Sequence, residues 1–324
     1  MPTRKERIEG GLVGLLVGDA LGVPYEFSSP DELPPAELIE FEPPPDFRRA
    51  HSGTPCGTWS DDSAQALCLL DSLLTCGRFE AEDFARRLLR WDDDGYMAVD
   101  NRVFDIGITT ARGLSALRVG MPPLQAGPTG ESANGNGSLM RVLPLALWHQ
   151  GPDAGLIVDA QAQSRVTHGH LRSQLCCALY CLWARRILHE HPTPWEDAVS
   201  TLRNFYAEIP PVLEELDQFI RLDAPPETPG SGYVVDCLRS SRVAIAAGPY
   251  EVAVKAAVLM GRDTDTTACV TGGLAGLRDG IDAIPTRWRT GLRGESIYRP
   301  LLEALLAHEG VPTPAGDVPP SLAP

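Results

Sequence analysis

Two acidic motifs, far apart in the chain, each run directly into a long apolar segment. The apolar runs at residues 64–74 and 268–277 are preceded, respectively, by Trp59-Ser60-Asp61-Asp62-Ser63 and by Gly261-Arg262-Asp263-Thr264-Asp265-Thr266-Thr267. Burying carboxylates beside apolar side chains is costly unless their charge is compensated. The amides at a helix N-terminus compensate part of that charge, and divalent cations can compensate the rest. We therefore expect a fold in which the two acidic helix starts face each other.

A third apolar segment, residues 8–21, is predicted to form a helix in the core. Gly14, Gly18 and Gly22 recur at intervals of four and so share one helical face. Each glycine lowers helix propensity by about 1 kcal/mol relative to alanine. Only close packing against another helix can offset that loss, and the segment ends in a turn that carries Glu26.

The remaining apolar runs also have helical spacing, and the alternation typical of strands is almost absent. They include a helix at 81–91 that ends before an acidic turn at 92–96, and a last helix at 301–308. With 43% hydrophobic residues the chain can fill a sizeable core. We predict the all-α class, as a single-domain, compact multi-helix bundle over residues 1–310. The segment 311–324 is rich in proline and is expected to be a disordered tail.

The charge balance and the cysteines restrict partners and location. Lys and Arg number 28 against 43 Asp and Glu, a net charge of −15 without a basic stripe, so neither nucleic acid nor a membrane is expected as a partner. The eight cysteines form no Cys-x-x-Cys pair, which indicates free thiols in a reducing cytoplasm. The apolar run at residues 12–17 is too short for a signal peptide. The oligomeric state is left open, with a monomer as the expectation.

Each acidic motif has a purely structural interpretation, because hydroxyl caps and early acids are common at helix starts. Their density before such apolar helices favours a metal site. Four carboxylates with flanking hydroxyls form a set of hard oxygen ligands suited to Mg²⁺ or Mn²⁺. If the motifs converge, two ions about 3.5–4 Å apart become feasible.

Three other places could carry chemistry, each with a structural alternative. Asp105 lies between apolar residues and could either cap a helix or, facing the acids, handle protons. The glycine-rich run around Asn136, Gly137 and Ser138 offers amides to a phosphate, although a plain turn also explains it. His168 could contact a ligand or cap the following helix.

Five motifs, in their order along the chain, resemble the ADP-ribosylglycohydrolase family, and in particular its dinitrogenase reductase-activating bacterial branch. They are Gly18-Asp19-Ala20-Leu21-Gly22-Val23-Pro24-Tyr25-Glu26, Trp59-Ser60-Asp61-Asp62-Ser63, Phe104-Asp105-Ile106-Gly107, Asn136-Gly137-Ser138-Leu139-Met140-Arg141-Val142-Leu143-Pro144 and Asp263-Thr264-Asp265-Thr266. The resemblance implies an all-helical domain with a centre of two Mg²⁺ or Mn²⁺ ions.

The resemblance also implies a reaction: a metal-dependent hydrolase frees ADP-ribose from a modified side chain or other acceptor, reversing mono-ADP-ribosylation. The ions would hold the ribose hydroxyls and a water molecule. Asp105 would assist proton transfer, Asp62 would act beside it, and Glu26 would approach from its loop. The nucleotide would contact Asn136, Gly137, Ser138 and His168. The implied metal ligands are Ser60, Asp61, Asp62, Asp263, Asp265 and Thr266.

The sequence departs from the family pattern in two respects, and two alternative functions remain to be distinguished. Ser60 and Ser63 stand where threonines are common, and Arg262 replaces a common glycine. The chain could instead be a metal-dependent nucleotide phosphohydrolase, or a non-catalytic ADP-ribose-binding member of the family. The second alternative is disfavoured because all six ligand positions keep oxygen side chains. The residues do not reveal the acceptor, which could be arginine, serine, a nucleobase or a free metabolite, nor do they choose between Mg²⁺ and Mn²⁺.

Overall fold

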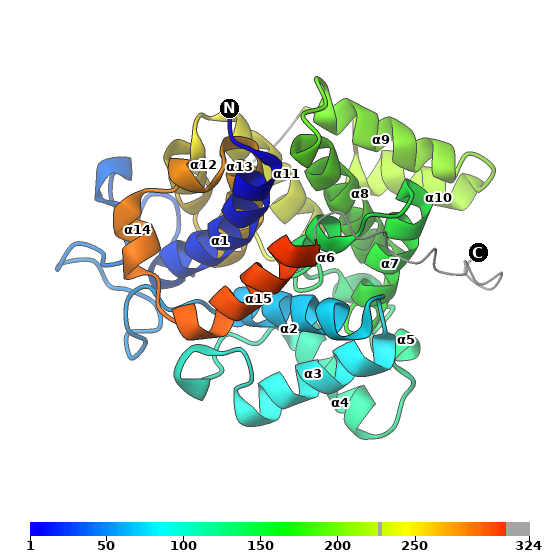
Figure 1. Cartoon of the computed structure of the whole chain (residues 1–324), viewed down its shortest axis with the longest axis horizontal. Helices are drawn as coiled ribbons and strands as arrows, with labels where there is room; N and C mark the ends of the chain where they lie inside the picture. Colours follow the sequence, from blue (N-terminus) through cyan, green and yellow to red (C-terminus); the bar gives the residue numbers. More distant parts are fainter. Residues whose placement is uncertain (226–228, 309–324) are drawn as a thin grey trace.

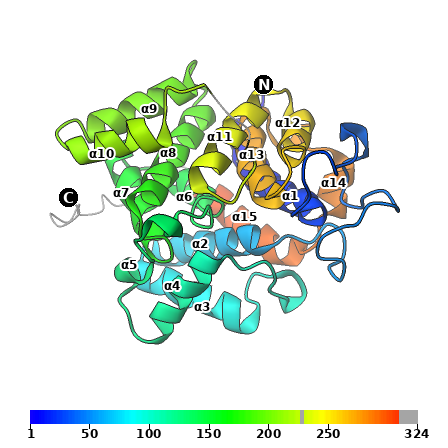
Figure 2. The ribbon, with the colours of Figure 1, turned by 180° about the vertical axis from the view of Figure 1, so that it is seen from behind.

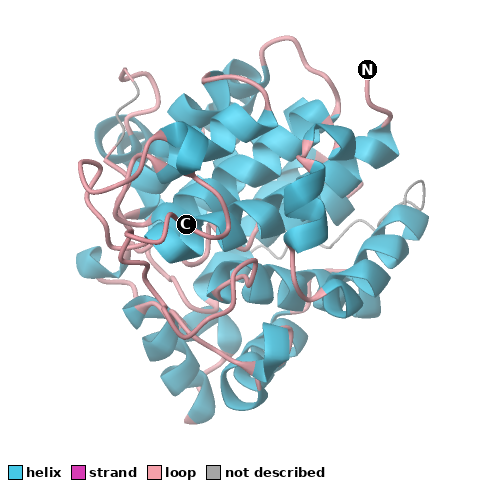
Figure 3. Cartoon of the chain, turned by 90° about the vertical axis from the view of Figure 1, so that its left-hand side faces the viewer, coloured by secondary structure: helices cyan, strands magenta, loops and turns pink. Residues whose placement is uncertain are grey.

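The computed structural model describes residues 1–225 and 229–308 (Figure 1). Within these residues helices and loops make up the chain, and the single β feature is an isolated bridge between Gly135 and Tyr233 (Figure 3). The predicted all-α class is confirmed. The predicted tail, 311–324, lies outside the described residues. The α-helices are α1 (Arg4–Gly22), α2 (Asp61–Cys76), α3 (Ala81–Asp94), α4 (Ile108–Arg118), α5 (Pro123–Ala126), α6 (Leu143–Trp148), α7 (Asp153–Arg165), α8 (Leu171–Leu188), α9 (Pro194–Phe205), α10 (Pro210–Glu214), α11 (Val234–Ala246), α12 (Tyr250–Val258), α13 (Thr264–Asp279), α14 (Thr286–Gly291) and α15 (Glu295–His308).

Helices α1 and α13 form the closest helix pair in the core and lie side by side (Figures 1 and 2). A methyl group placed on Gly18 would lie 2.1 Å from the carbonyl oxygen of Ala268, and one on Gly276 would lie 1.9 Å from that of Gly10. The two backbones are therefore in direct contact, as the glycine spacing predicts. Tyr250 adds a hydrogen bond of 2.8 Å from its hydroxyl to the Gly14 carbonyl.

The first helix is apolar and long enough to cross a membrane by composition, over Arg4–Tyr25. In the structure, however, 94% of its apolar window is buried against other helices. Its start is fixed by a capping box in which Thr3 and Glu6 exchange side-chain and backbone hydrogen bonds. It is a core helix of this fold.

Helix α2 is joined to α1 by a buried carboxylate. Asp19 accepts hydrogen bonds from the backbone amides of Ser60 and Ser63, each at 2.9 Å, and from the Ser63 hydroxyl at 2.5 Å. These bonds satisfy amides that a helix start would otherwise leave unpaired. They also fix the first turn of α2, which carries Asp61 and Asp62, against the middle of the core.

Several helices depart from the ranges that the sequence pattern predicts. Helices α7 and α14 occur in segments without a predicted helix. Helix α15 begins at Glu295 and continues through Pro300, where the sequence pattern predicts a helix only from Leu301. The acidic residues 92–94, predicted to form a turn, complete α3, and Gly95 ends it in the left-handed conformation.

Candidate active site

The two acidic helix starts meet in the folded chain. The hydroxyl of Thr266, in the first turn of α13, donates to Asp62 Oδ1 of α2 at 3.3 Å. Asp263 Oδ2 accepts from the Asn136 amide at 2.8 Å, which brings the glycine-rich loop to the same place. Residues far apart in the sequence thus form one carboxylate cluster.

Several carboxylate oxygens of this cluster are buried without a hydrogen-bond partner. They are Asp62 Oδ2 and both side-chain oxygens of Asp265. Within residues 1–225 and 229–308 no lysine or arginine forms an ion pair with the four acids of the two motifs. Burial raises the pKa of Asp61, Asp62 and Asp265 well above the usual range, and neighbouring carboxylates add to the shift.

Such unpaired buried oxygens fit a hard divalent cation. The donor set is oxygen throughout, with the hydroxyls of Ser60 and Thr266 beside the four carboxylates. The Ser60 hydroxyl caps α2 by accepting from the Asp62 amide at 3.4 Å. Asp263 occupies the N-cap of α13 without using its side chain for capping, so its carboxylate stays available.

Arg262 stands next to Asp263, where the family commonly has a glycine, and it does not enter the cluster. Its guanidinium donates to the Pro229 carbonyl at 2.6 Å. Gly261 and Arg262 both have positive φ, 74° and 63°, and this tight turn directs the arginine away from the acids. The positive charge is therefore bound elsewhere and does not neutralise the carboxylates.

Glu26 and Asp105 lie together at the edge of the cluster, with a histidine between their loops. Atoms of Glu26, His51 and Asp105 that can bind a metal lie within 4.8 Å of one another, and His51 Nε2 is 2.6 Å from Glu26 Oε2. Burial raises the pKa of Glu26 to about 10, with contributions from Asp105, Asp263 and Asp62. Asp105 has φ of 58° and precedes Gly107, the N-cap of α4. It therefore does not cap the helix.

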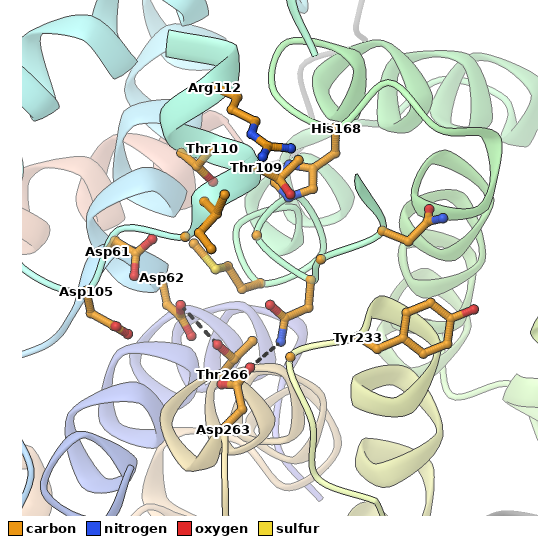
Figure 4. Close-up of a pocket in the computed structure, with 18 of the residues that line it drawn as sticks. Asp61, Asp62, Asp105, Thr109, Thr110, Arg112, His168, Tyr233, Asp263 and Thr266 are labelled. Atoms are coloured by element: carbon orange, nitrogen blue, oxygen red, sulfur yellow. Dashed lines mark hydrogen bonds between the residues drawn. The ribbon is translucent and has the colours of Figure 1, made fainter. Parts of the chain in front are cut away.

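A cavity of about 620 Å³ opens over the carboxylates (Figure 4). Asn136, Gly137 and His168 line it, together with Thr109 and Thr110 at the start of α4. Burial lowers the pKa of His168 to about 3, which keeps the ring neutral, and its Nδ1 lies 2.9 Å from the Thr167 hydroxyl.

The cavity leaves out one residue of the glycine-rich loop and includes others that the sequence patterns do not single out. Ser138 is fully buried behind the wall, where its hydroxyl accepts from Ser164 Oγ at 2.8 Å. No sequence motif marks the added residues, because a local pattern does not show which loops meet in the fold. The residues that the structure adds are His51, beside Glu26, and Arg112, Glu131 and Tyr233, on the cavity wall.

Comparison with known proteins identifies the family to which this chain is related. A family model described as ADP-ribosylglycohydrolase matches residues 1–314. The chain belongs to the ADP-ribosylglycohydrolase family. A solved structure titled "ADP-ribosylglycohydrolase-related protein complex" superposes with a TM-score of 0.75 at 31% sequence identity, covering 94% of this chain and 98% of the other.

Curated relatives of this ADP-ribosylglycohydrolase include two named enzymes. "ADP-ribosylarginine hydrolase Tri1" of Pseudomonas putida is 30% identical and aligns over 87% of this chain and 73% of its own length. "ADP-ribosyl-[dinitrogen reductase] glycohydrolase" of Rhodospirillum rubrum is 27% identical, over 96% and 99%. The family expected from the five motifs is confirmed, and with it an enzyme that hydrolyses ADP-ribosyl glycosidic bonds.

Without divalent cations, the stability of this ADP-ribosylglycohydrolase should fall as the pH rises from 7 to 8. Burial raises the pKa of Glu26 to about 10, and the pKa values of Asp61, Asp62 and Asp265 are raised in the same direction. The folded state therefore binds more protons than the unfolded state in this range, and stability falls as the pH rises towards the folded pKa. Each carboxyl that stays protonated in the folded state lowers the free energy of unfolding by about 1.4 kcal/mol for each unit that the pH rises. Thermal melts in chelator at pH 7.0, 7.5 and 8.0 measure the slope.

The pH window separates the raised carboxyl groups, Glu26 among them with a pKa of about 10, from histidines and cysteines. The buried His149 and His168, with pKa values lowered to about 4 and 3, change stability mainly below about pH 6.5, and cysteines act mainly above about pH 8. Adding Mn²⁺ should flatten the slope, because ligated carboxylates are ionised in the folded state too. An equally flat profile in chelator would contradict the assigned protonation.

Proposed function

We propose that the chain removes ADP-ribose from a modified protein side chain, with two Mg²⁺ or Mn²⁺ ions held by the carboxylate cluster. The observation that carries this proposal is the meeting of two acidic helix starts, with unpaired buried oxygens on Asp62 and Asp265, at a 620 Å³ cavity. A nucleotide sugar needs a hollow of this size. The proposed metal ligands are Ser60, Asp61, Asp62, Asp263, Asp265 and Thr266.

The chemistry that such ions supply is polarisation of oxygen ligands and neutralisation of carboxylate charge. The ligands are held in place by groups behind them. Gln65 donates to Asp61 Oδ2 at 2.9 Å, and Asp19 fixes the amides of Ser60 and Ser63. These hydrogen bonds orient the acids before any substrate binds.

The reaction adds water across the bond between C1 of the ribose and the acceptor atom. The water oxygen bonds to C1, the bond to the acceptor breaks, and the acceptor takes up a proton. Asp105 lies at the edge of the cluster and is partly exposed, so it can move this proton. Glu26 lies beside it, bound to His51, and lines the same cavity.

The rest of the cavity fits the nucleotide. Asn136 and Gly137 line the cavity, and because Gly137 carries no side chain a diphosphate can approach the backbone there closely. Ser138 can contribute only its backbone, because its hydroxyl is turned into the core. The aromatic ring of Tyr233 stands at the side of the cavity opposite Asp105 and offers a surface on which a base can stack (Figure 4).

A panel of ADP-ribosylated peptides and nucleosides with different linkages tests the proposal. We expect free ADP-ribose from the arginine-linked peptide first, because one relative is named an ADP-ribosylarginine hydrolase. Chelation should stop the release, and Mg²⁺ or Mn²⁺ should restore it. Mass spectrometry of the products separates the alternatives: AMP or phosphate would indicate a phosphohydrolase and would refute glycosidic cleavage.

A further inference from the structure

The cavity has a strongly uneven charge. Its lining includes six carboxylic acids, which are Glu26, Asp61, Asp62, Asp105, Glu131 and Asp263, against a single arginine, Arg112. His168 adds no positive charge, because burial lowers its pKa to about 3. A ligand that brings two further negative charges needs a compensating cation on the wall away from the acids.

Arg112 has no partner of its own within the described residues. Neighbouring arginines are already committed: Arg118, on the same helix, pairs with Asp92 and Asp93. Arg172 pairs with Glu215 and with Glu131, so the charge of Glu131 is compensated and five acids of the lining face Arg112 alone. No hydrogen bond or ion pair holds the Arg112 guanidinium in residues 1–225 and 229–308, and the side chain is exposed. An arginine that lines a cavity without a protein partner is available to a ligand.

Its position is next to the glycine-rich loop. Arg112 stands on the wall with Thr109 and His168, whereas Asp105 and Asp263 lie at the other side of the cavity (Figure 4). A methyl group on Gly137 would lie 2.9 Å from both the Thr110 hydroxyl oxygen and His168 Cε1, so this wall and the loop are in close contact.

A second group on the same wall also lacks a partner. His168 is 1% exposed, its Nδ1 is engaged by Thr167, and Nε2 forms no hydrogen bond within the described part of the chain. This ring nitrogen and the Arg112 guanidinium are therefore two unpaired polar groups on the cavity wall, beside backbone that a ligand can approach.

We propose that Arg112 binds the diphosphate of the substrate and selects for the doubly anionic ADP-ribosyl group. This rests on the proposed function. The planar guanidinium can donate two parallel hydrogen bonds to phosphate oxygens, which a lysine cannot match in geometry. Because Arg112 lies across the cavity from Asp105, its contribution falls on binding and leaves the bond-breaking step largely unaffected.

The test compares Arg112→Gln and Arg112→Lys with Arg118→Gln, a matched control on the same helix that lies outside the cavity lining. Calorimetry with free ADP-ribose on the Mn²⁺-loaded enzyme should show Kd raised about 10- to 100-fold in Arg112→Gln, the range for losing a hydrogen bond to a charged group. Arg112→Lys should recover part of the affinity. KM should rise with Kd while kcat stays within about threefold, and the weakening of binding by salt should diminish.

The outcomes separate this assignment from the proposed function. If the wild-type enzyme neither binds ADP-ribose nor releases it, the proposed function is wrong. If the wild-type enzyme does both and Arg112→Gln binds ADP-ribose within twofold of wild type, only the role of Arg112 is overturned. An equal loss in Arg118→Gln would reduce the effect to general surface charge and would also overturn it.

Discussion

Asp62→Ala and Asp263→Ala should each abolish the release of ADP-ribose and lower the content of bound Mg²⁺ or Mn²⁺. Each acid belongs to a buried cluster whose oxygens have no cationic protein partner, so each removal takes away charge that a divalent ion requires. Even groups that merely orient metal ligands cost 10- to 100-fold when mutated, so we expect a loss of more than about 100-fold in kcat. Turnover and metal content of the purified variants measure the effect.

The loss should not come from unfolding. Removing a buried carboxylate also removes its burial cost, so the variants should keep their helicity and, in chelator, should melt no lower than the wild type. Asp282→Ala is the control: this acid follows α13, its side chain is 85% exposed, and it pairs with Arg289. Full activity with unchanged metal content in Asp263→Ala would contradict the assignment of the cluster.

Part of this site could be predicted because its chemistry is local. Ser60 with Asp61 and Asp62, and Asp263 with Asp265, are recognisable from a few residues and the apolar run that follows. Their meeting was inferred from the cost of burying unpaired charge, and the Thr266–Asp62 hydrogen bond confirms it. The resemblance to a family supplied the roles that spacing alone left open, including those of Glu26 and Asp105.

Other parts depend on contacts that no short pattern encodes. His51 reaches Glu26 from a proline-rich loop, and its ring packs against Phe104, 5.0 Å between centroids, from the loop that carries Asp105. Asp19 caps α2 from another helix, a contact that exists only once α1 and α2 are packed. Asp105 adopts a positive φ, which its sequence neighbourhood does not predict.

The helices, too, could be predicted only in part. The glycines of α1 predicted a close helix partner, because no other arrangement offsets their low propensity. The pattern could not name that partner, and it gave no indication of α7. The pattern placed the last helix after Pro300, yet α15 runs through this proline, and the buried side chains of Tyr298, Leu302 and Leu305 hold the helix in the core despite the lost amide donor.

Gly18→Ala should lower the free energy of unfolding by about 3 kcal/mol or more, at the upper end of the range for overpacked cores. The added methyl group would lie 2.1 Å from the Ala268 carbonyl oxygen, and this neighbour is backbone, which cannot rotate away. Relief requires α1 and α13 to separate. Gly18→Val should yield little soluble protein, and denaturant titration of Gly18→Ala measures the loss.

Two further glycines test whether backbone contact is the cause. A methyl group on Gly11 would lie 2.8 Å from Cγ and 2.9 Å from Cδ2 of Leu277, a side chain that can move, so Gly11→Ala should cost less than Gly18→Ala. Gly130 has free space around it and negative φ, so Gly130→Ala should be nearly neutral. Equal losses at Gly18 and Gly130 would contradict the packing argument.

The same packing places the site. A methyl group on Gly22 would lie 2.3 Å from the Cα of Asp265, so contact between α1 and α13 sets the position of an acid in the cluster. Gly22→Ala should therefore reduce metal content and turnover more than Gly11→Ala does, even where both variants are folded at the assay temperature. Metal content that follows stability alone across the glycine series, without an excess loss in Gly22→Ala, would show that the helix contact supports the fold but does not position the acid.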